Sequence, residues 1–197
     1  VPNAGDIKFV PQRDIEYKQE ITDEDRTILG KDVPDFTYGV NLSLQYKGFE
    51  FSMFGQGISG TKVAFDVYGV HPFYHGQDSP RKYHLKRWTE ENPNPHAAYP
   101  RIYSASSVHT TYNRNFSDYH LFDSDYFRFK TLSLGYTVPS ATVNNWGLQS
   151  LKVYVTGENL FTVRADKKME DFDPETAGGV IYTLGTKSVA FGVNISF

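Results

Sequence analysis

The last ten residues, SVAFGVNISF (188–197), alternate strictly between apolar side chains and small or polar ones. Successive side chains of a β-strand point to opposite faces, so this alternation predicts a strand with one apolar and one polar face. Chain ends usually fray unless neighbouring structure pairs with them. An apolar stripe that runs to the final phenylalanine therefore predicts that neighbouring strands hold this segment in a sheet.

Four further stretches of the chain show the same period of two. The pair Lys47-Gly48 joins the first two stretches and predicts a tight hairpin. In the third stretch the apolar parity changes between Phe129 and Leu132, which predicts a bulge or an interfacial aromatic belt near Lys130. Amphipathic helical periodicity is scarce, so the chain is predicted to be all-β. The four stretches are 37–46, 49–56, 125–138 and 151–161.

The length of these strands favours a membrane protein. Strands of about ten residues exceed the globular mode of about five or six and match the nine to eleven of a tilted membrane strand. No apolar run approaches the roughly 20 residues of a membrane helix. Alternation alone also fits a half-buried sheet in a soluble sandwich. That alternative predicts that Val40, Leu134, Val153 and Val193 pack together inside a water-soluble body.

The connections between the predicted strands are short at one end of the sheet and long at the other. If the strands are antiparallel, the short turns at 46–49 and 139–148 lie on one rim, and the long segments 1–35, 59–124 and 162–186 lie on the other. Outer-membrane barrels have this asymmetry, with long loops outside the cell. Five strands cannot close, and open edges in lipid leave backbone groups unsatisfied. The sequence therefore predicts about five strands of a larger antiparallel transmembrane β-barrel.

Five stretches, in this order, resemble the end of the SusC/RagA family of TonB-dependent outer-membrane transporters of Bacteroidetes. The resemblance covers nearly the whole chain. The stretches are VPDFTYGVNLSLQYKGFEFSMFGQGISG (33–60), RWTEENPNPHAAYPR (87–101), DSDYFRFKTLSLGYTVP (123–139), LKVYVTGENLFT (151–162) and FGVNISF (191–197).

The resemblance implies that residues 1–197 are the C-terminal part of a 22-stranded barrel in the bacterial outer membrane. The plug domain and the TonB box would lie outside this chain. A SusD-like surface lipoprotein would cap the barrel as a lid, and the TonB complex would supply energy to import oligosaccharides or oligopeptides. Glycan and peptide both stay open, because specificity resides in long loops, the lid and regions outside the chain.

The resemblance also implies a role in assembly for the final strand, since a C-terminal strand ending in phenylalanine is the signal that the outer-membrane barrel assembly machinery recognises. The alternative is simple packing against lipid. The residues concerned are Phe191, Val193, Ile195 and Phe197.

Polar residues that alternate with the apolar stripe are candidates to line the barrel lumen. They could border a substrate path or contact the plug, although mere hydration of a polar interior explains them equally well. These candidates are Asn41, Gln45, Glu50, Gln56, Lys152 and Glu158.

Aromatic residues of the long central segment are candidates for ligand or lid contacts, because flat rings with polar tips stack on sugars and anchor partner proteins. Packing of the segment against itself is the favoured alternative, since a loop of this length predicted without strands needs an internal core. The candidates are Tyr68, Phe73, Tyr74, Trp88, Tyr99 and Tyr103.

The sequence contains no clear metal-binding pattern. Five histidines of the central segment lack a helical frame and neighbouring carboxylates set for tetrahedral ligation, so no metal site is predicted. They are His71, His75, His84, His96 and His109. In the stretch 19–30, only Asp23, Glu24 and Asp25 cluster, without the alternating oxygen ligands of a calcium loop. These acids are therefore predicted to form a solvated turn, and calcium binding is doubtful.

Other classes of function are excluded or disfavoured. A net charge of −3 with scattered Lys and Arg lacks the basic footprint of a nucleic-acid-binding protein. The absence of cysteine excludes disulfides and thiolate metal sites. No set of residues supports catalysis, so neither an enzyme nor a cofactor is expected. The alternatives to an active transporter are a soluble β-rich carbohydrate-binding module and a passive porin-like barrel.

Overall fold

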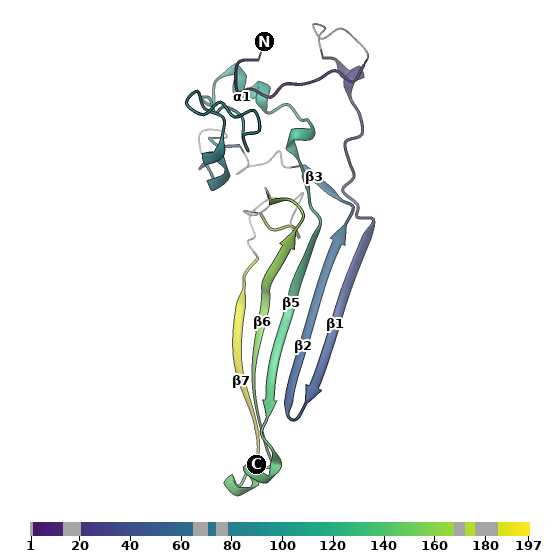
Figure 1. The fold of residues 1–197 in the computed structure, drawn as a ribbon, viewed down its shortest axis with the longest axis vertical. Coiled ribbons are helices and arrows are strands. Elements are labelled where there is room, and N and C mark those ends of the chain that lie inside the picture. Colours follow the sequence, from purple (N-terminus) through teal and green to yellow (C-terminus); the bar gives the residue numbers. More distant parts are fainter. Residues whose placement is uncertain (1, 14–20, 65–70, 74–78, 168–171, 176–184) are drawn as a thin grey trace. The chain divides into compact units, whose positions relative to one another are not determined.

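The computed structural model describes residues 2–13, 21–64, 71–73, 79–167, 172–175 and 185–197 (Figure 1). The chain divides into two compact units, each treated by itself below. The sheet unit comprises 33–61, 124–165 and 184–197, and the loop unit comprises 1–32, 62–123 and 166–183.

The sheet unit is a five-stranded antiparallel sheet in which the strands neighbour one another in chain order, as Figure 1 shows. The prediction of about five long antiparallel strands is confirmed. The strands are β1 (Phe36–Tyr46), β2 (Phe49–Ser59), β5 (Tyr126–Thr137), β6 (Ser150–Arg164) and β7 (Ser188–Ser196).

The predicted bulge lies at Lys130. Phe129 and Thr131 pair with Gly55 and Phe54 of β2, so Lys130 is the extra residue in that ladder. The bulge reverses the parity of β5 and thereby places Phe129 on the same face as Leu132. The bulge explains why the apolar residues of β5 change from odd to even positions along the sequence, although they all lie on the same face of the sheet.

The register puts most apolar residues of the five strands on one face and most polar residues on the other, while Phe54 and Ile58 of β2 lie on the polar face. Tyr46, Phe49, Tyr136, Val153 and Val193 form one rung of the apolar face. Glycines fill several positions of this face on β2. An apolar stripe on every strand is the pattern of a sheet with one face in an apolar medium.

The connections at one end of the sheet are short. Lys47 and Gly48 have φ values of 47° and 88°, which a two-residue hairpin of the right twist requires, so the predicted tight turn is confirmed. The 138–149 connection holds α2 (Ser140–Val143) and η5 (Asn144–Trp146), where the sequence predicts only a turn. At the other end, the chain leaves the sheet after Ser59 and Arg164 for long segments.

The loop unit holds more regular structure than the sequence predicts. A two-stranded sheet pairs β3 (Lys62–Ala64) with β4 (Leu121–Asp123), so the expectation of a strand-free central segment is wrong. The helices are η1 (Asp23–Asp25), η3 (Lys82–Lys86), α1 (Val108–Asn113) and η4 (Asp118–His120). Within the described part of the chain, no helix combines the length and apolar character needed to cross a membrane.

Gly57 of β2 allows a close approach between β2 and β5. A Cβ at this position would lie 2.3 Å from the backbone carbonyl oxygen of Tyr126 and 2.8 Å from the Tyr38 ring. We expect Gly57→Ala to reduce the free energy of unfolding by about 1–3 kcal/mol, because the backbone of β5 must move to relieve the overlap. Urea titration of the complete transporter in liposomes measures this change.

Gly39→Ala is the matched control, because a Cβ at Gly39 meets the Phe54 ring at 3.6 Å and the Gly55 carbonyl oxygen at 3.7 Å, which are ordinary contacts. Equal stability of the two variants would contradict the argument from close approach.

Candidate functional site

The six predicted lumen residues all lie on the polar face of the sheet. The register pairs Gln45 with Glu50, and Glu158 with Thr131. Asn41, Gln56 and Lys152 follow the same parity. The alternation therefore identified the shared face correctly, while the role of this face as a lumen lining stays a prediction.

An ion pair on the polar face connects β2 with β6 across β5. Lys152 Nζ lies 2.5 Å from Glu50 Oε2, and the Thr137 hydroxyl donates to Glu50 Oε1 at 3.3 Å. The lysine passes over Gly135, where a Cβ would lie 3.1 Å from Lys152 Cε. Each member of the pair has about a third of its side chain exposed, so solvent screening keeps its energetic contribution small.

A hollow of about 360 Å³ surrounds this ion pair on the polar face. Because Glu50 and Lys152 neutralise each other, the hollow presents hydroxyl and amide groups rather than net charge. Ser133 and Thr156 share a hydrogen bond of 3.1 Å in its wall. The lining residues are Ser43, Leu44, Gln45, Glu50, Phe51, Ser52, Ser133, Gly135, Lys152, Tyr154, Thr156 and Asn194.

Tyr154 is a residue of this face that the sequence did not single out. Its ring lies over Gly192 of β7, where a Cβ would approach within 2.1 Å of the ring. Tyr154 pairs with Gly135 on one side and with Gly192 on the other. The signal for Tyr154 is a glycine directly opposite it on each flanking strand. This signal can be read only once the register of the strands is known.

The apolar face of the sheet is exposed. Val40, Leu134, Val153 and Val193 have exposed fractions of 46, 49, 42 and 59%. A soluble sandwich would bury these side chains in a core, so the structure contradicts the prediction made by that alternative. Phe191 and Phe197, both candidate assembly residues, are each 83% exposed. Phe191, Val193 and Ile195 share one face of β7, and Phe197 directly follows this strand.

The aromatic candidates of the loop unit differ in what their rings contact. Tyr99 accepts or donates a hydrogen bond of 3.0 Å with His71 Nδ1 and meets the His84 ring edge-on at 4.6 Å. Burial raises the pKa of the Tyr99 hydroxyl above its usual value. Tyr99 is therefore part of the internal packing of the loop unit. Phe73 is 45% exposed, whereas Tyr68 and Tyr74 lie outside the described residues.

Trp88 and Tyr103 flank one arginine. The Arg101 guanidinium lies 5.7 Å from the Trp88 ring centre and 5.3 Å from that of Tyr103. Gly5 packs against the indole of Trp88, where a Cβ would lie 2.4 Å from the ring. The Tyr103 ring also stacks on His109 at 4.9 Å. These contacts favour self-packing over ligand stacking for both rings.

A buried carboxylate ties the first residues of the loop unit to α1. Asp6 accepts hydrogen bonds from Asn113 Nδ2 at 2.9 Å and from the Asn3 backbone at 2.7 Å, and its Oδ2 lies 2.8 Å from His109 Nδ1. Burial opposes ionisation of Asp6, but these hydrogen bonds outweigh it and hold its pKa below the usual value. The sequence did not reveal this cluster, because more than 100 residues separate Asp6 from His109 and Asn113.

Two of the predicted histidines, His71 and His84, are buried in the loop unit. His84 Nδ1 accepts a hydrogen bond of 2.7 Å from the Arg81 backbone, and His71 is 2% exposed. His96 is exposed, and His75 lies outside the described residues. Across the described ranges, no group of three His, Asp or Glu side chains is placed to hold a metal ion.

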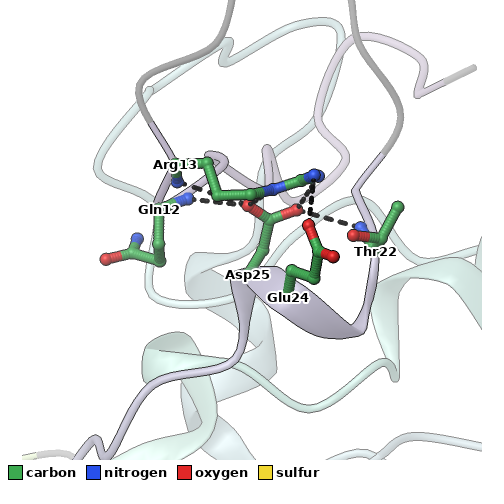
Figure 2. A network of polar contacts seen from close by, with 5 residues as sticks. All are labelled: Gln12, Arg13, Thr22, Glu24 and Asp25. Atoms are coloured by element: carbon green, nitrogen blue, oxygen red, sulfur yellow. Dashed lines mark hydrogen bonds and ion pairs between the residues drawn. The ribbon is translucent and has the colours of Figure 1, made fainter.

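The acidic stretch differs from its prediction as a solvated turn. Figure 2 shows the Asp25 carboxylate enclosed by donors: the Arg13 guanidinium at 2.9 and 3.0 Å and the Thr22 backbone at 2.9 Å. The Gln12 backbone also donates to it, at 3.1 Å. The side chains of Asp23 and Glu24 are 87% and 75% exposed, so the prediction holds for both, whereas it is wrong for Asp25, which is 3% exposed.

The hydrogen bonds of Asp25 predict how the stability of this segment depends on pH. The Arg13 guanidinium, with the Thr22 backbone N–H, holds the pKa of Asp25 well below its usual range. The stabilisation is therefore present above the unfolded pKa of about 3.9 and is lost only as the pH falls through the lower folded value. We expect hydrogen exchange of peptides containing Arg13 or Thr22, corrected for intrinsic rates, to be equally slow at pH 7 and pH 5.

Asp25→Asn should accelerate this exchange at both pH values, because the amide weakens the contact with Arg13. Asp23→Asn is the control, since Asp23 is 87% exposed and touches an exposed arginine. Acceleration in both variants would mean that charge on η1, rather than the enclosed carboxylate, holds the segment.

Comparison with known proteins identifies relatives of the chain. No family model matches it. TonB-dependent receptor P3 of Formosa agariphila is 30% identical over 149 residues, which are 76% of this chain and 14% of the relative. TonB-dependent receptor P26 of the same organism is 28% identical over 187 residues, 90% of this chain and 18% of the relative. The chain thus spans less than a fifth of the length of these relatives.

Solved structures show the same fold. The structure of the RagAB peptide transporter matches with a TM-score of 0.61 and 26% identity, over 83% of this chain and 17% of that one. The RagAB peptide importer in its closed-closed state matches with a TM-score of 0.65 and 24% identity, over 90% and 19%. Identity to named TonB-dependent receptors, joined to a fold shared with RagAB, means that the chain belongs to the SusC/RagA type of TonB-dependent outer-membrane transporters.

Proposed function

We propose that this chain forms part of the barrel wall of an active importer, which takes up oligosaccharides or oligopeptides with energy from the TonB complex. Residues 1–197 would be the C-terminal part of the barrel. The segments 1–35, 59–124 and 162–186 would be extracellular loops, and a SusD-like lipoprotein would cover the barrel as a lid. The plug would be supplied by other residues of the complete transporter.

The observation that carries this proposal is the uncovered apolar face. Side chains such as Val193 are more than half exposed although they lie in the middle of regular strands. Leaving so many large apolar side chains in water is costly, at about 25 cal/mol per Å² of apolar surface. Lipid removes this cost, and a barrel wall is the arrangement that presents one face of a sheet to lipid.

The polar face supports a role as lumen lining. The hollow beside Glu50 and Lys152 is rich in hydroxyl and amide groups, which suit contact with water, with a plug or with a polar substrate. A relative named as a peptide transporter supports oligopeptides as one of the two substrate classes. The named relatives are receptors and transporters, which fits a protein that is not an enzyme.

Uptake measurements test the energy coupling. We expect cells that carry the complete transporter to accumulate labelled oligopeptide or oligosaccharide, and to lose this uptake when the proton gradient is collapsed or TonB is removed. The amount of transporter in the outer membrane must stay unchanged in the same cells. Uptake that survives both treatments would favour the passive porin-like barrel and overturn the proposed coupling.

A further inference from the structure

Small residues with hydroxyl groups form the floor of the hollow on the polar face. Four neighbouring strands each contribute one such residue to the same rung: Ser43, Ser52, Ser133 and Thr156. Gly135 lies on the next rung toward the hairpin end, where it pairs with Glu50. Side chains of this size leave room above the sheet, and their hydroxyl groups make the floor polar but uncharged.

The charged residues that line the hollow are Glu50 and Lys152, and the other lining residues are uncharged. Lys152 pairs with Thr137, one rung nearer the hairpin end than Glu50, and reaches Glu50 diagonally over Gly135. About a third of each charged side chain is exposed. A solute in the hollow therefore meets both charges together, and these charges cancel.

Charged residues close to the hollow along the chain lie outside it. Lys47 of the hairpin has its Nζ 5.3 Å from the ring centre of Tyr46, which belongs to the apolar face. Glu158 lies four residues from Tyr154, about 14 Å along β6. The Debye length is about 8 Å at physiological ionic strength, so salt screens Glu158 from the hollow. The charge of the hollow therefore depends on Glu50 and Lys152.

We propose that the Glu50–Lys152 ion pair sets the charge selectivity of this part of the barrel wall, by keeping the hollow neutral so that cationic and anionic solutes enter it alike. The inference rests on the proposed function, because a solute path exists here only if the polar face lines a lumen. A cleft that carries net charge concentrates solutes of the opposite sign. Oligopeptides differ widely in net charge, and a neutral wall neither retains nor repels them.

Single substitutions of the pair must then have opposite effects. Glu50→Gln leaves the positive charge of Lys152 without compensation, whereas Lys152→Gln leaves the negative charge of Glu50. The double substitution Glu50→Gln with Lys152→Gln removes both charges and restores neutrality without an ion pair. Structural damage would not follow this pattern, since its effect does not depend on the sign of the solute.

The reaction of a thiol in the hollow with charged reagents tests the proposal. Ser52→Cys places a thiol on the floor, two residues from Glu50 on the same face of β2. The complete transporter, in a background without other reactive cysteines, is reconstituted in liposomes with each substitution of the pair. Rates are measured with the trimethylammonium-ethyl and sulfonato-ethyl methanethiosulfonates, which differ in the sign of their charge. Folding of each variant is checked by its heat-dependent migration on gels.

The quantity compared is the ratio of the cationic to the anionic rate, divided by the same ratio for free 2-mercaptoethanol. We expect Lys152→Gln to raise this ratio and Glu50→Gln to lower it, each by about five- to tenfold. A unit charge about 7 Å away in water changes the local concentration of each reagent about threefold, in opposite directions for the two signs. The double variant should match the intact pair.

Ionic strength provides a second reading of the same variants. The differences should be large at about 0.01 M salt and should nearly vanish at about 1 M, where the Debye length is about 3 Å. A ratio that neither single substitution changes, or that both move in the same direction, would refute the proposal. Failure of both reagents to react at position 52 would also refute it, because the hollow would then be closed to solutes.

The labelling rates involve no energy source, so they are independent of the uptake measurements. Uptake by the unsubstituted transporter that persists without TonB would count against the proposed active import alone. Unchanged rate ratios combined with TonB-dependent uptake would count against the charge selectivity alone.

Discussion

Replacing Leu42 by arginine is expected to reduce the stability of the membrane-inserted barrel by about 2–4 kcal/mol, the cost of a basic residue near the bilayer midplane on a lipid-facing strand. Leu42 lies on the apolar face of β1, midway between Tyr38 and Tyr46, and is 40% exposed within this chain. Urea titration of the complete transporter in liposomes measures the loss.

Ser43→Arg is the matched control, because Ser43 is the next residue of the same strand and lines the hollow on the polar face. The new side chain there can reach water, so we expect a change well below that of Leu42→Arg. The soluble-module alternative makes a different prediction, since neither substitution would then introduce a charge into lipid. Equal effects of the two substitutions would argue against a lipid-facing wall.

Phe197→Ala is expected to lower the amount of assembled transporter in the outer membrane several-fold while leaving refolding of the purified protein into liposomes nearly unchanged. This result follows from the proposed role of the last residue as an assembly signal. Loss of lipid packing alone would instead weaken both assembly in cells and refolding in liposomes.

Phe191→Ala is the control that separates packing from recognition. Phe191 lies in β7 and Phe197 directly follows this strand, and both are 83% exposed, so a pure packing effect should be of similar size at the two positions. Assembly in cells is measured by heat-dependent gel migration of outer-membrane fractions. Similar losses of assembled transporter in both variants would contradict an assembly role of Phe197.

The sequence predicted the sheet well because its signal is local. Alternation with a period of two is set by the pleat of each strand, so the stretches 37–46 and 151–161 identify strands and faces without knowledge of their neighbours. The parity change near Lys130 likewise requires a bulge on that strand alone if its apolar face is to stay continuous. The hairpin at Lys47-Gly48 is also a local feature.

The candidate sites were predicted less completely. Alternation placed Glu50 and Lys152 on one face, but their contact depends on the register of three strands and on Gly135 between them. The three acids from Asp23 to Asp25 look alike in sequence, yet only Asp25 is enclosed, because Arg13 folds back onto it. Such differences arise from which distant groups meet, and no local pattern records them.

The amino-acid sequence by itself thus determined the strands, their two faces and the turn at the hairpin end, since backbone geometry and side-chain polarity act over a few neighbouring residues. Only the tertiary structure decided that Tyr99 packs inside the loop unit, that Asp6 joins His109, and that Tyr38 of β1 stacks on Phe127 of β5. These features depend on register and on contacts between residues far apart in the chain, whose energies exist only once the chain has folded.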